Sequence, residues 1–394
     1  MMYFDNAATT MTHPDVIMAM MPYLSEHFGN PSGVYEYARS ARKAVETARR
    51  QIAELINAKP EEVFFTGSGT EADNWAVKGA AEARGAKGRH IITSAVEHHA
   101  ILHSCQYLEK QGYLVTYLPV DADGFVSPEE VEKALRKDTV LVTIMLANNE
   151  IGTIQPLAAI GEITRRHGVW LHTDAVQAVG HIPVDVEAMR LDMLTLSAHK
   201  FYGPKGVGAL YMRGGVALKP FVHGGAQESN RRAGTENVAG IVGAGAAVAI
   251  CAGEMPAEYA RLRALRDKLI SGIEKSIPHA HLNGSRENRL PGNVSFSFDF
   301  AEGRSLLLSL DKEGCYASGG SACSSGSPDP SHVLLALGVP RERAQGTVRF
   351  SMGRYTTEAD VDALLSLLPP VVERLRAMSP QYEDYLNRQK NVNN

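Results

Sequence analysis

Cysteine is scarce in this sequence. The 394 residues include four cysteines, Cys105, Cys251, Cys315 and Cys323, with no CxxC pair and no zinc-type spacing. A disulfide framework and a zinc site are therefore disfavoured, and free thiols in a reducing compartment fit this usage best. We expect a cytoplasmic protein that binds no metal.

The sequence also lacks an excess of charge of one sign and a long hydrophobic run. Its net charge of −4 gives no electrostatic basis for binding nucleic acid or an anionic membrane. The N-terminal residues show no basic segment followed by an apolar one, so we expect no secretory signal. The longest apolar run, Val238 to Ala252, is rich in glycine and alanine. We expect it to be too short to span a bilayer and to form a packed internal helix.

What the sequence does contain is an ordinary globular balance, with 44% hydrophobic and 21% charged residues, in a chain long enough for two domains. Short β-branched or apolar segments alternate with helix-like stretches in its first half. Such strands between helices predict an α/β fold with a mainly parallel, seven-stranded sheet covered on both faces. The predicted strands are Glu62–Thr66, His90–Val96, Leu114–Val120, Val140–Leu146, Gly168–Thr173, Asp192–Leu196 and Val207–Met212.

The pattern changes in the C-terminal third. A charged helix is predicted near Pro256–Ser276, and an amphipathic helix begins at Thr357, where Asp360 completes a helix-start signal. Between them lie strand-like and helix-like segments that predict a smaller α+β domain. These segments are Gly292–Phe300, Gly303–Lys312 and Val348–Met352.

The segment Phe65–Ala72 follows a predicted strand and opens a helix. Exposed amide groups at such a helix start favour a phosphate. The pattern Gly67-x-Gly69-x-x-Ala72 also satisfies the dinucleotide fingerprint, although its acidic partner would have to be Glu97, which lies too far along. By itself the segment is equally consistent with a phosphate cup, a dinucleotide loop and a plain turn.

A second apolar strand delivers Ser197, His199 and Lys200 at its end, before a turn rich in glycine and proline. A lysine just past a buried strand loses its proton easily, because desolvation disfavours the ammonium form. Its main use as a nucleophile is a Schiff base with pyridoxal 5'-phosphate (PLP). The alternative for a lone lysine is an ordinary surface position.

Other strand ends carry complementary groups. Asp174 can keep a pyridine nitrogen protonated, or it can simply cap a helix. Gln177 is placed to donate towards the cofactor's ring oxygen, and Asn149 is a further polar group at the same edge. His98 can stack on a planar cofactor. The parallel sheet would bring these residues together with Thr70 and Lys200.

Histidines next to His98 suggest a different site. His99 and His103 are four residues apart and could share a helix face as metal ligands. No third ligand of suitable spacing is evident, so we favour the stacking role for His98.

Two later residues complete the candidates. Cys323 lies among glycines and serines, which predicts an exposed, mobile and reactive thiol rather than a packed one. Arg349 lies between apolar neighbours on a predicted strand. It could clamp a substrate carboxylate in bidentate fashion, or form a surface ion pair of little consequence.

Taken together, these motifs resemble the NifS/IscS-type cysteine desulfurases, which are class V aminotransferase-like, fold-type-I PLP enzymes. The resemblance runs from Phe4 to about Ser379. It rests on the segments 66–74, 97–98, 148–152, 174–177, 197–206, 232–235 and 321–323. It implies a large PLP-binding domain at residues 14–256, and a small domain formed by residues 1–13 and 257–394. It also implies a homodimer with active sites at the subunit interface.

The resemblance also implies roles for individual residues. Lys200 would carry the cofactor and move the Cα proton, His98 would stack on the ring and serve as an acid or base, and Cys323 would take the sulfur. The substrate carboxylate would be bound by Arg349, with Asn149 and Asn30 beside it. The cofactor would be held by Gly69, Thr70, His98, Asn149, Asp174, Gln177, Ser197, His199 and Lys200, with Thr235 reaching the partner subunit's phosphate.

The implied reaction converts L-cysteine to L-alanine and a persulfide on Cys323, for donation to an Fe–S scaffold protein or to tRNA thiolation. A selenocysteine lyase or a class V aminotransferase on the same fold is an alternative. Outside PLP chemistry, a dehydrogenase and a sulfur-relay or scaffold protein remain open. The sequence does not identify the sulfur acceptor, or separate a housekeeping role from a dedicated one.

Overall fold

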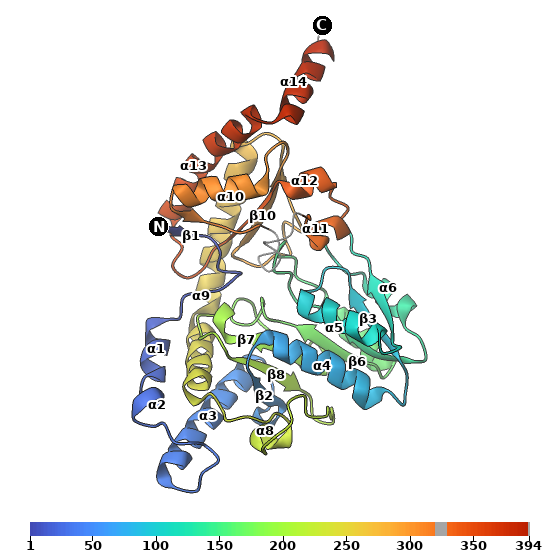
Figure 1. The fold of residues 1–394 in the computed structure, drawn as a ribbon, viewed down its shortest axis with the longest axis vertical. Helices are drawn as coiled ribbons and strands as arrows, with labels where there is room; N and C mark the ends of the chain where they lie inside the picture. Colours follow the sequence, from blue (N-terminus) through green and yellow to red (C-terminus); the bar gives the residue numbers. More distant parts are fainter. Residues whose placement is uncertain (320–328, 393–394) are drawn as a thin grey trace.

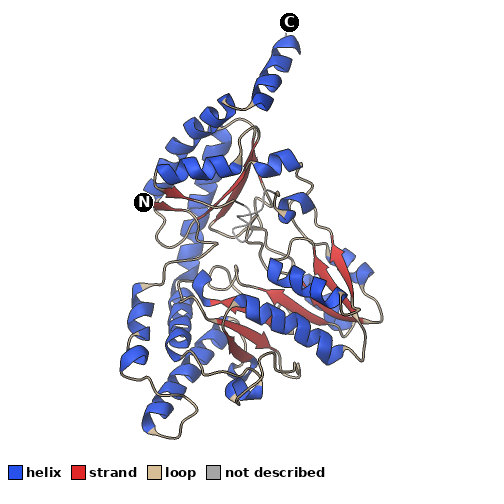
Figure 2. Ribbon diagram, in the orientation of Figure 1, coloured by secondary structure: helices blue, strands red, loops and turns tan. Residues whose placement is uncertain are grey.

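The structure is a computed structural model that describes residues 1–319 and 329–392. Cys323 lies outside the described residues. A seven-stranded sheet forms the centre of the larger part of the chain (Figures 1 and 2). Its strand order is β2-β8-β7-β6-β5-β3-β4, and β8 alone runs antiparallel to its neighbours. The strands are β2 (Val63–Thr66), β3 (His90–Ser94), β4 (Leu114–Leu118), β5 (Thr139–Thr143), β6 (Trp170–Asp174), β7 (Met193–Ser197) and β8 (Gly208–Met212).

Both faces of this sheet are buried, as the apolar strands predict. On β2, Phe64 packs with the helices on one face and Phe65 packs on the other, because successive side chains point to opposite faces. Helices α4 and α5 supply the first face, and α3, α7 and part of α9 supply the second. The helices of this part are α1 (Pro14–Met20), α2 (Pro22–Ser25), α3 (Glu36–Leu55), α4 (Gly69–Arg84), α5 (His99–Glu109), α6 (Pro128–Ala134), α7 (Leu157–Arg166) and α8 (Gln227–Asn230).

The remainder of the chain forms a second hydrophobic core around a three-stranded antiparallel sheet. The N-terminus belongs here, because β1 pairs with β11 and Phe4 is fully buried in this core. Helix α13 begins with a capping box between Thr357 and Asp360, as expected. The elements are β1 (Met2–Tyr3), β9 (Ala280–Leu282), β10 (Asn293–Phe298), β11 (Cys315–Tyr316), β12 (Thr347–Ser351), α10 (Gly303–Lys312), α11 (His332–Ala336), α12 (Arg341–Gln345), α13 (Glu358–Ala377) and α14 (Pro380–Val392).

A single helix, α9 (Val238–Ser276), joins the two cores (Figure 1). Its first half packs in the larger core and its second half in the smaller one. The sequence predicted a short apolar helix and a separate charged helix, and this is wrong, because the chain continues as helix through Pro256. The predicted domain limit at residue 256 therefore lies inside one helix.

Helix α9 also corrects the expectation that its apolar run is too short to span a bilayer. By length and composition alone it could cross a membrane, since its most apolar 18-residue window has a mean hydropathy of 1.8. In the structure 56% of that window is buried against other parts of the chain. Burial of this kind is found in the core helices of soluble proteins, so the expectation of a packed helix agrees with the structure.

Candidate active site

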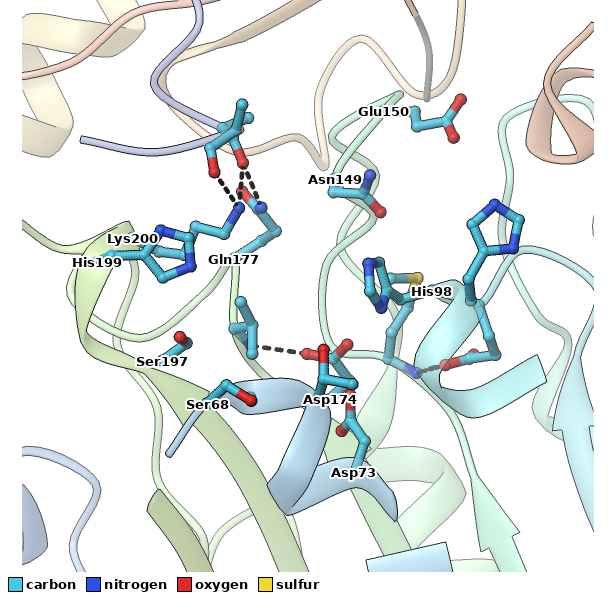
Figure 3. Close-up of a pocket in the computed structure, with 18 of the residues that line it drawn as sticks. Ser68, Asp73, His98, Asn149, Glu150, Asp174, Gln177, Ser197, His199 and Lys200 are labelled. Carbon is cyan, nitrogen blue, oxygen red and sulfur yellow. Dashed lines mark hydrogen bonds between the residues drawn. The ribbon is translucent and has the colours of Figure 1, made fainter. Parts of the chain in front are cut away.

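A cavity of about 290 Å³ lies at the carboxyl ends of the parallel strands. Strands β2, β3, β5, β6 and β7 run in the same direction, so the groups that follow them meet at one edge of the sheet. Figure 3 shows these side chains around the cavity. Most of the predicted site residues line it: Gly69, Thr70, His98, Asn149, Asp174, Gln177, Ser197, His199, Lys200 and Arg349.

Lys200 lies on one side of the cavity, at the end of a 3-10 turn that follows β7. Its Nζ donates hydrogen bonds to the carbonyl oxygens of Ala7 at 2.6 Å and Ala8 at 2.7 Å (Figure 3). Gln177 Nε2 donates to the same Ala7 oxygen at 2.9 Å. The N-terminal segment, residues 5–10, therefore passes directly beside the candidate reactive amine, and we call it the N-terminal strap.

The strap is a part of the site that sequence reasoning missed. Ala7 and Ala8 contribute only main-chain oxygens, so their side chains carry no chemical signature. The available signal was the segment Asp5–Thr10, where the family resemblance begins.

The floor of the cavity is acidic. Asp174 ends β6 and is buried, and its Oδ1 accepts a hydrogen bond from the Val176 amide at 2.9 Å. Burial raises the pKa of Asp174, and the nearby His98 and Lys200 oppose that rise. A carboxylate in this position can face the ring nitrogen of a bound cofactor.

Asp73 lies beside Asp174 on the floor (Figure 3) and was not predicted. It is 1% exposed, and its Oδ1 has no hydrogen-bond partner among the described residues. His172 Nε2 is 3.8 Å away, but burial lowers the pKa of His172 to about 3, so the imidazole is neutral. Burial, reinforced by Asp174, raises the pKa of Asp73 well above its ordinary value. An acidic residue on the buried face of α4 was the signal that could have found it.

Glu97 is another buried carboxyl group at this edge, where Glu150 is buried as well. It accepts hydrogen bonds from Ser94 Oγ at 2.6 Å and from the Met145 amide at 3.0 Å. Burial raises the pKa of Glu97 to about 8, and these two hydrogen bonds limit the rise. Near neutral pH the residue is therefore mainly a neutral acid.

His98 stands at the other side of the floor as the N-cap of α5, and its Nδ1 accepts the Ala100 amide at 3.2 Å. The neutral ring therefore carries its proton on Nε2. Three possible metal-ligating atoms lie within 4.8 Å of one another, one each from Asp73, His98 and Asp174, and this spacing would suit a cation. The histidines that first suggested a metal, His99 and His103, instead stack on each other with centroids 5.1 Å apart.

The start of α4 lines one end of the cavity and could bind a phosphate. Ser68 caps this helix by accepting the Glu71 amide, and the first N–H groups of a helix have no partner within it. A Cβ at position 69 would lie 2.8 Å from the Val176 side chain, so only glycine allows this close approach. Ser197 and His199 line the same end, and burial lowers the pKa of His199 to about 4.

On the opposite side, β12 presents Arg349 to the cavity. Its Nη1 donates to the Asn149 carbonyl and its Nη2 to Asp5 Oδ1, both at 2.8 Å. Its Nε is buried and has no partner among the described residues. The alternative interpretation of Arg349 as part of a surface ion pair is excluded, because the residue is 1% exposed.

Some predicted residues are not at this cavity. Asn30 and Thr235 are both exposed and do not line it. Asn30 Oδ1 is instead engaged by the Ser32 amide in its own loop. The predicted nucleophile Cys323 lies outside the described residues.

These features fit PLP. The buried carboxyl group of Asp174 could pair with a ring nitrogen, the helix start at Gly69 could bind a phosphate, and the Lys200 amine lines the same cavity. This arrangement does not require the acidic residue that binds the ribose of a dinucleotide cofactor.

Comparison with known proteins agrees with this fit. The family model "Aminotransferase class-V" matches residues 2–364. The chain is 52% identical to "Cysteine desulfurase IscS" of Clostridium botulinum over 390 residues, covering 98% of each protein.

Solved structures are also similar. A NifS-like protein superposes with a TM-score of 0.88 at 40% identity, covering 95% of this chain and 99% of that one. SspA in complex with cysteine superposes with a TM-score of 0.81 at 38% identity, covering 91% and 100%. The expected fold-type-I architecture is thereby confirmed. The chain belongs to the class-V aminotransferase family and, within it, to the PLP-dependent cysteine desulfurases of the IscS type.

Proposed function

We propose that the cavity between Lys200, Asp174 and Arg349 is where this desulfurase binds PLP and L-cysteine. The observation that carries the proposal is that an amine, a buried carboxyl group and a buried guanidinium line one cavity. Similarity to SspA, whose structure holds cysteine, supports the choice of substrate.

The residues divide the work as follows. Lys200 Nζ would hold the cofactor and move the proton at the substrate's Cα. Asp174 would keep a proton on the ring nitrogen, His98 would stack on the ring, and Arg349 would bind the substrate carboxylate. Bound PLP supplies an electron sink for the pair left at Cα.

Cys323 takes the sulfur in this proposal. Its thiolate attacks the substrate sulfur, and the S–Cβ bond breaks with its electron pair left on carbon. Protonation of that carbon gives L-alanine, and the persulfide remains on Cys323. A thiol of ordinary pKa, about 8.5, is mostly protonated at neutral pH, so the loaded site has to provide a base.

The experiment is a reconstitution of the purified chain with PLP, followed by measurement of L-alanine and of protein persulfide after addition of L-cysteine. We expect both products from the native chain. Cys323→Ala should retain the cofactor's visible absorption and lose persulfide. Sulfide release by Cys323→Ala in the presence of dithiothreitol would contradict this role for Cys323.

We propose that the protein is a homodimer. Supporting this, several large apolar side chains of the N-terminal region are exposed in the single chain, among them Met18, Leu24, Phe28 and Val34. Thr235 and Asn30 are exposed and away from their own cavity, as residues that serve a partner's site would be. The test mixes Lys200→Ala and Thr235→Ala chains. One site of each heterodimer would then be intact, so the mixture should exceed either variant alone.

We also propose a cytoplasmic enzyme that donates sulfur to an Fe–S scaffold protein or to tRNA thiolation, without direct contact with nucleic acid or membrane. The name IscS among the relatives supports the Fe–S partner. The cysteines within the described residues, Cys105, Cys251 and Cys315, are free, which suits a reducing compartment. Transfer of labelled sulfur to a purified scaffold protein tests the acceptor.

A further inference from the structure

The N-terminal strap connects the two sides of the cavity. At its start, Ser351 on β12 donates its amide to the Phe4 carbonyl at 2.7 Å. At its end, Thr10 donates its amide to the His199 carbonyl at 3.0 Å. The strap therefore runs from the strand that carries Arg349 to the turn that carries Lys200.

Arg349 is a buried cation with one ionic partner, Asp5, among the described residues. Arginine is rarely buried without a partner, because an unpaired charge in the interior is costly. The side chain of Asp5 is 22% exposed and does not line the cavity, whereas Arg349 does. The guanidinium thus lies between Asp5 and the place where a substrate would bind.

We propose that Asp5 is a positioning residue for the carboxylate site: it orients the Arg349 guanidinium towards the cavity, and it competes with a bound carboxylate for that positive charge. The inference rests on the proposed role of Arg349 in binding substrate. It extends that role to a residue that acts through Arg349 without touching the substrate.

The hydrogen bonds of Arg349 show how its guanidinium can contact Asp5 and a substrate carboxylate at the same time. Asp5 occupies an N–H of Nη2, and the Asn149 carbonyl occupies an N–H of Nη1. A guanidinium has five N–H donors in a fixed plane, and Nε–H has no partner among the described residues. The Nε atom is itself buried, so an incoming carboxylate would bind at the second N–H of Nη1 or Nη2 while Asp5 stays in place, and the two negative charges would then share one cation.

Removing the charge of Asp5 should have two linked effects. Asp5→Asn keeps an acceptor oxygen but leaves the buried Arg349 charge uncompensated, so the empty protein becomes less stable. The same uncompensated charge binds an incoming carboxylate more strongly, by about 3- to 10-fold. A carboxylate ligand should therefore restore the lost stability.

The test uses the holoenzyme and propionate, a carboxylate with no amino group that could react with the cofactor. Thermal unfolding is followed at increasing propionate, and the Kd is measured by calorimetry. We expect a lower Tm for Asp5→Asn without propionate, a larger rise of Tm with it, and a lower Kd than for the native chain. The KM for L-cysteine should fall by a similar factor, without a rise in kcat.

A matched control is Asp299→Asn. Asp299 belongs to the smaller core, accepts a hydrogen bond from Arg343 Nε at 2.9 Å and is 19% exposed at its side chain, much like Asp5. It does not line the cavity. Its loss should lower the Tm, and propionate should then raise the Tm no more than in the native chain.

The variant Arg349→Gln distinguishes a failure of the role proposed for Asp5 from a failure of the role proposed for Arg349. If it abolishes the propionate response while Asp5→Asn responds like the native chain or more weakly, the role of Asp5 is wrong and that of Arg349 stands. If Arg349→Gln responds like the native chain, the assignment of the carboxylate site itself fails. Asp5→Ser also removes the charge, and it serves as the second variant if Asp5→Asn gives no soluble holoenzyme.

Discussion

The two walls of the cavity differ in charge and in origin. Four buried carboxyl groups line the cavity: Asp73, Glu97 and Asp174 in the wall built by the large sheet, and Glu150 in the loop after β5. The opposite wall carries one buried cation, Arg349. Burial raises the pKa of the carboxyl groups, so the acidic wall holds fewer charges than it has acids. The basic wall instead keeps its charge by pairing it with Asp5.

This difference indicates a division of labour. The acidic wall can stabilise a protonated ring nitrogen and so acts on the chemical step. The basic wall can hold a carboxylate and so acts on substrate binding. Lys200 follows β7 and is hydrogen-bonded through its Nζ to the strap that joins the two walls.

The largest effect is expected where the two walls meet. Lys200→Ala removes the only side chain proposed to bind the cofactor covalently, and L-alanine formation should fall by at least about 1,000-fold. Lys205→Ala is the control, because Lys205 is exposed five residues further on and does not line the cavity. L-alanine formation by Lys200→Ala close to the native rate would remove the basis of the proposed chemistry.

The next effect separates the acids of one wall. Asp174→Asn removes the carboxylate proposed for the ring nitrogen, and kcat should fall by about 100-fold or more. Asp73→Asn should change kcat less, because burial raises the pKa of Asp73 and so already disfavours the charge that this substitution removes. Steady-state kinetics and the visible spectrum of the holoenzyme measure both. Equal losses in the two variants would show that the wall acts as a single unit.

A substitution of Arg349 in the basic wall should mainly change the KM for L-cysteine. Arg349→Lys keeps a positive charge but loses the planar set of donors, so we expect KM for L-cysteine to rise by about 10- to 100-fold, with a smaller change in kcat. Initial rates over a range of L-cysteine concentrations give the two parameters. A fall confined to kcat would contradict the assignment of this wall to binding.

The smallest effect concerns pH and stability. The pKa of Glu97 is raised from 4.5 to about 8, so the stability it contributes is fully present below pH 4.5 and is lost as pH rises towards 8. Glu97→Gln is neutral throughout. Its free energy of unfolding, relative to the native chain, should therefore become more favourable as pH rises from about 5 to about 8. Denaturant unfolding across that range tests this, and a constant difference would show that Glu97 does not titrate there.

Several residues of the wall built by the large sheet could be predicted from sequence, although Asp174 is the only one of its buried acids among them. His98, Asn149, Asp174 and Lys200 each follow a strand, and parallel strands of a sheet deliver their ends to one edge. Local sequence patterns were sufficient to predict these residues, because the common direction of the strands brings the residues that follow them together.

The basic wall depends on contacts between distant parts of the chain. Asp5 and Arg349 are 344 residues apart, and no periodicity indicates that they pair. Ala7 and Ala8 act through their main chain, which leaves no trace in residue type. The continuity of α9 through Pro256 was likewise missed, because packing in two cores outweighs the local preference of proline to end a helix.

The main-chain contacts of the strap have one more consequence. Because Lys200 Nζ is held by the carbonyl oxygens of Ala7 and Ala8, exchanging their side chains leaves those two bonds in place. Only a change in the route of the chain can remove them. A shortened protein that starts after residue 10 would lose the acceptors of the amine and the partner of the guanidinium in a single cut. The groups proposed to bind the two ends of the substrate would then both have lost the contacts that the strap provides.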